Sequence, residues 1–140
     1  MRFSATIFII DPWNELEHSR KHGETETEYT GRAIRALKRF AKAFRVHVCV
    51  IAHPTKSVKD GDGNYKMPTL YDIAGSANWY NKADLGVIVH KDTLEYRDDP
   101  YTLIKVQKSR YHEVIGTPGE VFMDFSKDAR RFEEVQRGPK

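Results

Sequence analysis

The sequence lacks several features that mark secreted, zinc-binding or membrane proteins. Cys49 is the single cysteine in 140 residues, so no internal disulfide can form. Its place in the apolar run VHVCVIA predicts a small buried hydrophobic residue in a reducing compartment rather than a reactive thiol. No HExxH pattern or His and Cys spacing predicts a zinc site. No apolar run approaches the roughly 18 residues of a membrane-spanning helix, and the N-terminus lacks a secretory profile. We therefore expect a soluble intracellular protein with no membrane partner.

Charge of one sign is not in large excess, and no repeat or low-complexity tract divides the chain. The 23 Lys and Arg residues against 20 Asp and Glu residues leave a net charge of +3, with an isoelectric point near 8.9. This balance permits nucleic acid or another anionic partner without requiring one. A hydrophobic share of 39% suits a single domain over residues 1–140.

The first half of the chain has the pattern of a strand, a helix and a second strand. The apolar run ATIFIID (5–11) predicts a short buried strand, and the polar segment 15–27 predicts a surface loop. A helix follows, whose apolar positions recur at spacings of three and four: Ala33, Leu37, Phe40, Ala41 and Phe44. The run VHVCVIAH (46–53) predicts the next strand. This order is typical of a right-handed parallel crossover, with the helix lying on the sheet.

The second half predicts a loop, a broken helix and several strands. The Gly, Asp and Lys-rich segment 55–68 is long enough to indicate a functional loop, and 70–84 predicts a short, interrupted helix. Strands are predicted over 85–91 and 101–110, with a turn and a partner strand over 114–125 and an edge strand in the tail. The expected fold class is α/β, a mostly parallel sheet flanked by helices with a C-terminal antiparallel hairpin.

Charged side chains follow the predicted strands, where a parallel sheet binds its ligands. Asp11 has the position of a Walker B acid, although a carboxylate after a strand also commonly caps a turn. His53 has a similar position, and the alternative is a hydrogen-bonded turn residue. Lys108 and Arg110 lie two residues apart on one predicted strand, so both point to one face. That pair predicts either an anion grip or a solvated edge.

Taken in order, these elements resemble the C-terminal half of the RecA-like motor in hexameric replicative DNA helicases. The likeness is nearest to the phage primase-helicase and Twinkle type, with DnaB more distant, and it covers residues 5–126. The stretches that carry it are IFIIDPWNELEH, RAIRALKRFAKAFRVHVCVIAHPTK, LYDIAGSANWYNKADLGVIVHK and VQKSRYHEVIGTPG. The resemblance implies a partial RecA-like fold and a P-loop NTPase that uses Mg²⁺ and ATP or another NTP.

The resemblance also implies roles at a nucleotide site. Asp11 is expected to be the Walker B acid, which contacts Mg²⁺ through water, and His53 is expected to sense the γ-phosphate. Lys108 and Arg110 match the pair that reaches across a subunit boundary to the neighbour's γ-phosphate, so a homo-oligomeric ring, a hexamer, is expected. Asn81 stands where the fourth helicase motif usually has Gln, which puts its coupling contact with the nucleotide site in doubt.

Two loops are expected to contact single-stranded DNA. In this family the loop directly after the phosphate-sensing His lines the central channel, and here it contains Lys56, Lys59 and Lys66. A mobile cation is enough to contact a phosphate, because no base is read. The alternative is a solvated loop. The earlier segment HSRKHGE matches a second DNA-facing loop, so Arg20 and Lys21 are weaker candidates.

The sequence contains no GxxxxGK[ST] loop. In the RecA-like order that loop and the catalytic glutamate precede Walker B, and only ten residues stand before Asp11. Nothing assigns Glu15 or Glu17 as the missing base. We therefore expect the C-terminal portion of a helicase motor, inactive in ATP hydrolysis on its own, from the cytoplasm of a bacterial or phage-infected cell. The alternatives are a non-catalytic nucleic-acid-binding or assembly module derived from a RecA-like ATPase, and a recombinase or clock-protein type of RecA relative.

Overall fold

The structure, a computed structural model, describes residues 6–55, 66–74, 76–91 and 101–135. Contacts divide the chain into two units, of which the first comprises Met1–Thr55 and Tyr71–Ala83 and the second Lys56–Leu70 and Asp84–Lys140. None of the helices within the described ranges is long and apolar enough to cross a bilayer.

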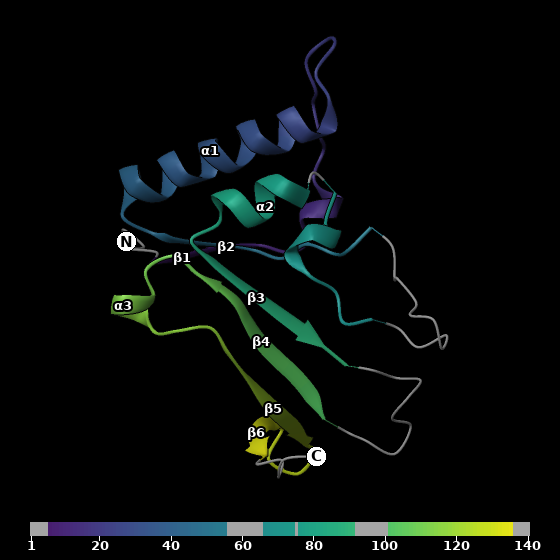
Figure 1. The fold of residues 1–140 in the computed structure, drawn as a ribbon, viewed down its shortest axis with the longest axis vertical. Helices are drawn as coiled ribbons and strands as arrows, with labels where there is room; N and C mark the ends of the chain where they lie inside the picture. The colour runs from purple at the N-terminus through teal and green to yellow at the C-terminus, as the bar shows by residue number, and fades with distance from the viewer. Residues whose placement is uncertain (1–5, 56–65, 75, 92–100, 136–140) are drawn as a thin grey trace, which may run out of the picture. The chain divides into compact units, whose positions relative to one another are not determined.

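The first unit contains the predicted parallel crossover (Figure 1). β1 (Ile7–Ile10) and β2 (His47–Val50) pair in parallel, and α1 (Glu26–Phe44) connects them. A short 3-10 turn, η1 (Trp13–Glu15), follows β1. Another, η2 (Leu70–Asp72), whose first residue Leu70 belongs to the second unit, precedes α2 (Ser76–Lys82), which lies beside α1. The strand, helix and strand expected from the sequence are therefore confirmed.

Local sequence signals define both ends of α1. The Thr25 hydroxyl accepts a hydrogen bond from the Glu28 backbone N–H, and the Glu28 carboxylate accepts one from the Thr25 backbone N–H. This capping box satisfies backbone donors that a helix start leaves unpaired. At the other end, Arg45 adopts a left-handed conformation with φ 52°, and its backbone N–H bonds back to the Ala41 carbonyl.

The core of the first unit lies between α1, η1 and α2. Trp13, Ile34 and Trp79 are buried in contact with one another, and the two indole rings meet edge to face with centroids 5.2 Å apart. The Trp79 Nε1–H donates to the Ala74 carbonyl at 2.8 Å. Partly buried side chains complete the cluster: Tyr29, Ala33, Leu37, Val50, Ala52 and Ile73. Phe44, the last of the apolar helix positions, is 67% exposed.

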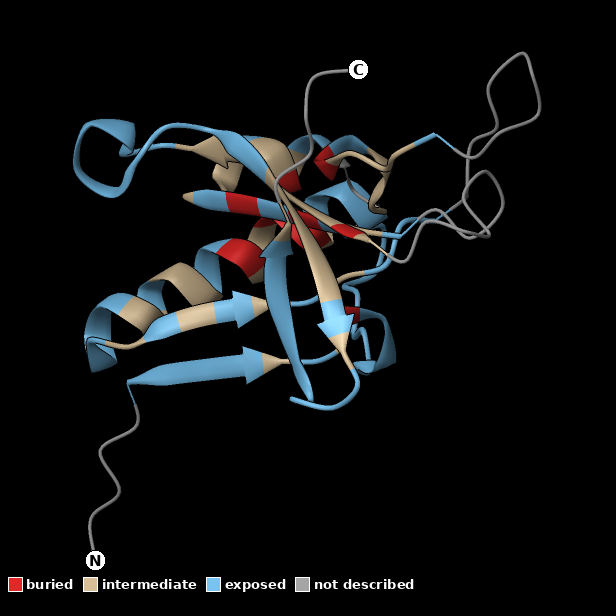
Figure 2. Ribbon diagram, turned by 90° about the horizontal axis from the view of Figure 1, so that it is seen from below, coloured by how far each residue is buried: buried red, intermediate tan, exposed pale blue. Residues whose placement is uncertain are grey.

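The expectation that the first strand is buried is wrong. Ile7 and Ile9 are 57% and 61% exposed, and Figure 2 shows β1 in pale blue for most of its length. Side chains alternate along a strand, so Phe8 faces α1, where its ring lies 5.3 Å from that of Phe40, while Ile7 and Ile9 face the other way. Cys49 pairs with Ile9 in the register and is also exposed, so its predicted burial is wrong for the same reason.

The second unit contains an antiparallel sheet in the order β3-β4-β5-β6. Its strands are β3 (Leu85–His90), β4 (Thr102–Ser109), β5 (Gly119–Ser126) and β6 (Arg131–Val135), with a short α3 (His112–Ile115) between β4 and β5. The mixed α/β class and the antiparallel hairpin are confirmed.

More of the described strands pair antiparallel than the sequence predicted, and β3 is one of them. Its apolar run does not indicate whether one face of the strand or both faces are covered. In the structure only alternate positions, Gly86 and Ile88, are buried, while Val87 and Val89 are 46% and 68% exposed. A continuous apolar sequence therefore occurs on a strand with one exposed face.

Candidate functional site

Asp11 and His53, the predicted nucleotide contacts, lie at the same edge of the β1–β2 sheet. Ile10 and Val50 pair in the register, and the Ile51 N–H donates to the Ile10 carbonyl at 2.9 Å. Both strands therefore end together, and the segments that carry Asp11 and His53 leave the sheet side by side. The carboxyl edge of a parallel sheet is where such folds bind ligands.

Asn14 links the two segments, and the sequence analysis did not find it. Its side-chain Oδ1 accepts a hydrogen bond from the His53 backbone N–H at 2.9 Å. The Trp13 N–H also donates to the Ile51 carbonyl at 2.7 Å. The turn after β1 therefore fixes the backbone before and at His53. The position of Asn14, three residues after the Asp11 that follows β1, was the one hint in the sequence. Its hydrogen-bond partner, His53, lies far along the chain.

The Asp11 carboxylate suits a Mg²⁺ ion chemically. It is exposed, and within the described ranges no side chain or backbone group forms an ion pair or hydrogen bond with it. Mg²⁺ in nucleotide sites keeps several waters and is held by one or two carboxylates together with phosphates. Across the same ranges, no group of at least three His, Cys, Asp or Glu residues could hold a metal without such help. A single carboxylate at the strand end fits an ion that arrives with a nucleotide.

Asn81 is exposed on α2, whose position against α1 is well defined. The Asn78 Nδ2 donates to the Thr27 carbonyl at 2.6 Å, and the Lys38 Nζ donates to the Lys82 carbonyl at 3.1 Å. Gly31 permits this approach, because a β-carbon there would lie 3.0 Å from the Asn78 Oδ1. The first unit thus contains Asp11, His53 and Asn81 on elements that contact one another.

Lys108 and Arg110 belong to the second unit. Lys108 lies in β4 opposite Gly86, but β4 ends at Ser109, so the expectation that Arg110 shares the strand is wrong. Arg110 lies in the turn that leads to α3. Its backbone N–H donates to the Asp84 carbonyl at 2.8 Å, and its Nε lies 3.3 Å from the Asp84 Oδ1. The sequence analysis did not identify Asp84 as a partner of Arg110.

Only part of the predicted DNA-binding set can be placed. Lys56 and Lys59 lie outside the described residues. Lys66 is described and exposed, in the segment that leads to η2. Arg20 and Lys21 are exposed in the segment 18–24, HSRKHGE, which we call the basic loop.

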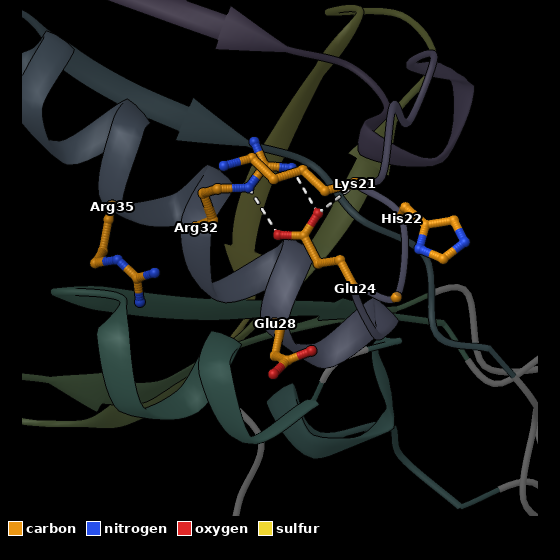
Figure 3. Close-up of a pocket in the computed structure, with 7 residues that line it drawn as sticks. Lys21, His22, Glu24, Glu28, Arg32 and Arg35 are labelled. Carbon is orange, nitrogen blue, oxygen red and sulfur yellow. Dashed lines mark hydrogen bonds and ion pairs between the residues drawn. The ribbon is translucent and has the colours of Figure 1, made fainter.

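The basic loop borders an open pocket of about 340 Å³ at the N-terminal part of α1 (Figure 3). Its lining residues are Lys21, His22, Gly23, Glu24, Glu28, Arg32 and Arg35. Figure 3 shows the Arg32 guanidinium and the Glu24 carboxylate directed toward each other, with Lys21 beside them. Arginines and a lysine near two carboxylates give this surface mixed charge rather than a purely cationic one.

Arg32 and Glu24 form a strong ion pair in this pocket. The Arg32 Nε and Nη2 donate to the two Glu24 carboxylate oxygens, each at 2.8 Å. These hydrogen bonds, with one from the Lys21 backbone N–H, lower the pKa of Glu24 to about 2. The same carboxylate raises the pKa of Arg32. At the helix start, the hydrogen bonds from Thr25 lower the pKa of Glu28.

Two known proteins are similar to this chain in sequence or in fold. The chloroplastic/mitochondrial Twinkle homologue of Arabidopsis thaliana is 38% identical over 129 residues, which are 91% of this chain and 18% of that protein. A DnaB-like replicative helicase, solved in a study of its interactions with primase, superposes with a TM-score of 0.72 at 22% identity, covering 93% of this chain and 30% of that chain. No protein-family model matches.

The chain thus spans less than a third of the length of each of these two proteins. The plant relative's name assigns that protein to chloroplasts and mitochondria, whereas our expectation of a bacterial or phage setting stays a prediction. The solved helicase shows the same fold, and the plant relative shows the similarity in sequence. The resemblance is therefore confirmed: this chain is similar to the C-terminal part of a DnaB- and Twinkle-like helicase domain.

Proposed function

We propose that this chain supplies the C-terminal portion of a ring-helicase motor that uses NTP hydrolysis to move on single-stranded DNA. The observation that carries the proposal is the shared strand edge of Asp11 and His53, with Asn14 joining the two segments. An acid and a phosphate sensor must act on one nucleotide, and only neighbouring strand ends bring them together. The similarity to Twinkle and DnaB-like helicases supports the same assignment.

In the proposed site each residue has a separate role. Asp11 holds water bound to the Mg²⁺ of the nucleotide, and that ion neutralises charge on the phosphate oxygens when it is bound. His53 senses the γ-phosphate from a backbone position that Asn14 fixes. Asn81, on α2, contributes a weaker polar contact, because its side chain is one methylene shorter than the usual Gln.

Lys108 and Arg110 are proposed to serve the nucleotide of a neighbouring subunit. A cation at the γ-phosphate stabilises the charge that develops during phosphoryl transfer. Arg110 lies at the exposed end of β4, and its pairing with Asp84 is an exposed ion pair of the kind that contributes little stability. Arg110 would therefore lose little free energy by leaving Asp84 and binding a phosphate of the neighbouring subunit. A shared site of this kind requires a homo-oligomeric ring, which we propose to be a hexamer.

Single-stranded DNA is the proposed polymer partner. We propose that Lys56, Lys59 and Lys66, in the segment that the sequence predicts to be a loop, and Arg20 and Lys21 in the basic loop supply cations to the phosphate backbone. Such contacts release counterions, so affinity should fall as salt rises, whatever the base sequence.

The DNA contacts can be tested on the 140-residue chain by fluorescence anisotropy with a labelled oligothymidylate over a salt series. We expect log affinity to fall linearly with log salt, and Lys56→Ala with Lys59→Ala to reduce the slope by about 1.4, at roughly 0.7 per contact. Lys42→Ala with Lys127→Ala removes the same charge from α1 and the second unit and should leave most of the slope. Binding that ignores salt, or equal effects of both double variants, would overturn the DNA assignment.

ATP hydrolysis by the 140-residue polypeptide alone is not expected, because its sequence has no GxxxxGK[ST] loop. The alternative function, a binding or assembly module derived from a RecA-like ATPase, makes a different prediction. Such a module would bind DNA without any role for Asp11 or Arg110. Activity tests of these two residues therefore separate the proposals.

A further inference from the structure

One guanidinium group on α1 holds both ends of the basic loop. Arg32 donates from Nε and Nη2 to the Glu24 carboxylate, and its Nη2 also lies 3.4 Å from the Ser19 carbonyl oxygen. Ser19 is near the start of the loop and Glu24 is its last residue. A planar, forked donor set is well suited to such a double contact, because its geometry is fixed.

Glu24 in turn closes the second half of the loop. Its Oε2 accepts a hydrogen bond from the Lys21 backbone N–H, and its own N–H donates to the Lys21 carbonyl, both at 3.0 Å. Gly23 occupies the left-handed region with φ 78°, which allows the tight return of the chain. The Glu24 side chain is only 11% exposed. Lys21 is therefore held by its backbone while its side chain stays at the surface.

The first half of the loop is held by aromatic contacts. The His18 ring packs against both Trp13 and Tyr29, with ring centroids 4.8 and 5.2 Å away, and its Nδ1 shares a hydrogen bond of 3.0 Å with the Tyr29 hydroxyl. The Arg32 guanidinium stands 5.1 Å from the centre of the same Tyr29 ring. The loop is thus tied to the core through Trp13 and to α1 through Tyr29 and Arg32.

These contacts leave the cationic side chains of Arg20 and Lys21 at the tip of a fixed loop. Arg20, Lys21 and His22 are exposed, whereas the polar groups on both sides are paired. Ordering the backbone of a flexible loop costs conformational entropy. When the free protein already has the bound shape, binding does not repeat that cost.

We propose that Glu24 and Arg32 are positioning residues, whose ion pair holds the basic loop so that Arg20 and Lys21 meet successive phosphates of single-stranded DNA. The inference rests on the proposed DNA binding. It adds that an acidic residue, which alone would repel DNA, strengthens binding through its effect on the loop.

The direction in which Glu24→Gln changes the affinity for DNA tests this proposal. Glu24→Gln makes the surface more positive, so charge alone predicts tighter binding of DNA. If Glu24 is a positioning residue, the affinity for a labelled oligothymidylate of about 16 nucleotides should instead become about 3- to 10-fold weaker. Glu17→Gln is the matched control, since Glu17 is exposed beside the loop, and it should tighten binding slightly. Arg32→Lys keeps the charge but loses the fork, so it should also weaken binding.

A double-mutant cycle makes the test specific to the loop. Lys21→Ala should weaken binding clearly in the natural protein and much less in the Glu24→Gln background, because the lysine is no longer held. Faster hydrogen exchange of the Lys21 amide in Glu24→Gln should accompany this. Circular dichroism of each variant checks the fold, and Arg32→Lys serves where Glu24→Gln does not fold.

The outcomes separate the two ideas. If Lys21→Ala weakens binding but Glu24→Gln tightens it as Glu17→Gln does, or if the cycle is additive, the positioning role is wrong and DNA binding stands. If Arg20→Ala and Lys21→Ala leave affinity and salt slope unchanged, the basic loop does not contact DNA, and the proposed function loses that contact.

Discussion

At the scale of single residues, the Glu24 carboxylate is the group whose charge the structure stabilises most clearly. Arg32 and the Lys21 backbone N–H donate to its oxygens, and these contacts lower its pKa to about 2. A lowered pKa in the folded state means that protons favour the unfolded state. The contribution to stability is therefore present above the usual glutamate range near pH 4.5 and is lost as the pH falls through about 2.

We predict that a carbon-13 titration of the natural chain places the Glu24 midpoint near pH 2, and that Arg32→Gln raises it toward the usual glutamate value. The Arg32 hydrogen bond is the largest cause of the shift, so its loss should account for most of the change. Arg35→Gln removes a nearby charge on the same helix without that hydrogen bond and is the control. A midpoint unchanged in Arg32→Gln would contradict the assignment.

Single positions also differ in how much they contribute to the core. Ile34→Ala should lower the free energy of unfolding by about 2 to 5 kcal/mol, because Ile34 is 6% exposed between Trp13 and Trp79. Ile9→Ala should cost about 0.5 kcal/mol or less, because Ile9 is 61% exposed. Urea unfolding followed by tryptophan fluorescence measures both. Equal losses of unfolding free energy in Ile34→Ala and Ile9→Ala would mean that the outer face of β1 is covered.

At the scale of elements, close approach explains why Gly86 is needed in β3. A β-carbon at Gly86 would lie 2.2 Å from the Leu70 Cδ1, and the Leu70 N–H donates to the Gln107 Oε1 at 2.8 Å. Leu70 is itself buried, so it has little room to move. The segment that enters η2 therefore packs directly on the backbone of β3.

Gly86→Ala should accordingly destabilise the second unit by about 1 to 3 kcal/mol, the usual cost of overpacking. Gly119→Ala, in β5 of the same sheet, meets no atom within 4 Å and should be neutral or slightly stabilising. Hydrogen exchange of β3 and β4 amides reports the unit directly. Similar exchange in the two variants would show that Leu70 moves aside without cost.

Element positions could be predicted from the sequence, whereas their burial could not. The apolar runs and the spacing of Leu37 and Phe40 placed β1, α1 and β2 close to their observed bounds. Burial depends on what covers each face, and the pattern of β1 is the same whether Ile9 is covered or exposed. The short α3 was missed because HEVI gives too few residues for any periodicity.

In the candidate site, too, some features could be predicted and others could not. The positions of Asp11 and His53 were predictable, because a residue after an apolar strand must lie at the sheet edge. The contacts of Asn14 with His53 and of Arg32 with Glu24 were not, since each joins residues on different elements with no local pattern. Arg110 was placed on β4, but its strand ends one residue earlier, where the turn to α3 begins.

At the scale of the whole molecule, the proposed ring shares each nucleotide site between two subunits. We predict that rings containing the complete motor lose activity faster than in proportion to the dose of Arg110→Ala subunits, because each altered subunit also disables its neighbour's site. Lys127→Ala subunits, altered at an exposed position outside the proposed site, provide the mixing control. A loss proportional to the dose would contradict a finger that acts in trans.

The central claim is that Asp11 belongs to a nucleotide site, and that the part of the motor domain carrying the GxxxxGK[ST] loop completes this site. Its most direct test is the DNA-stimulated ATPase rate of a chimera in which this chain replaces the matching 129 residues of the Arabidopsis relative. We predict an active chimera whose kcat falls at least about 100-fold with Asp11→Asn, because the carboxylate that holds the Mg²⁺ water is lost. An assembled chimera without activity, or one that Asp11→Asn leaves unchanged, would contradict the account.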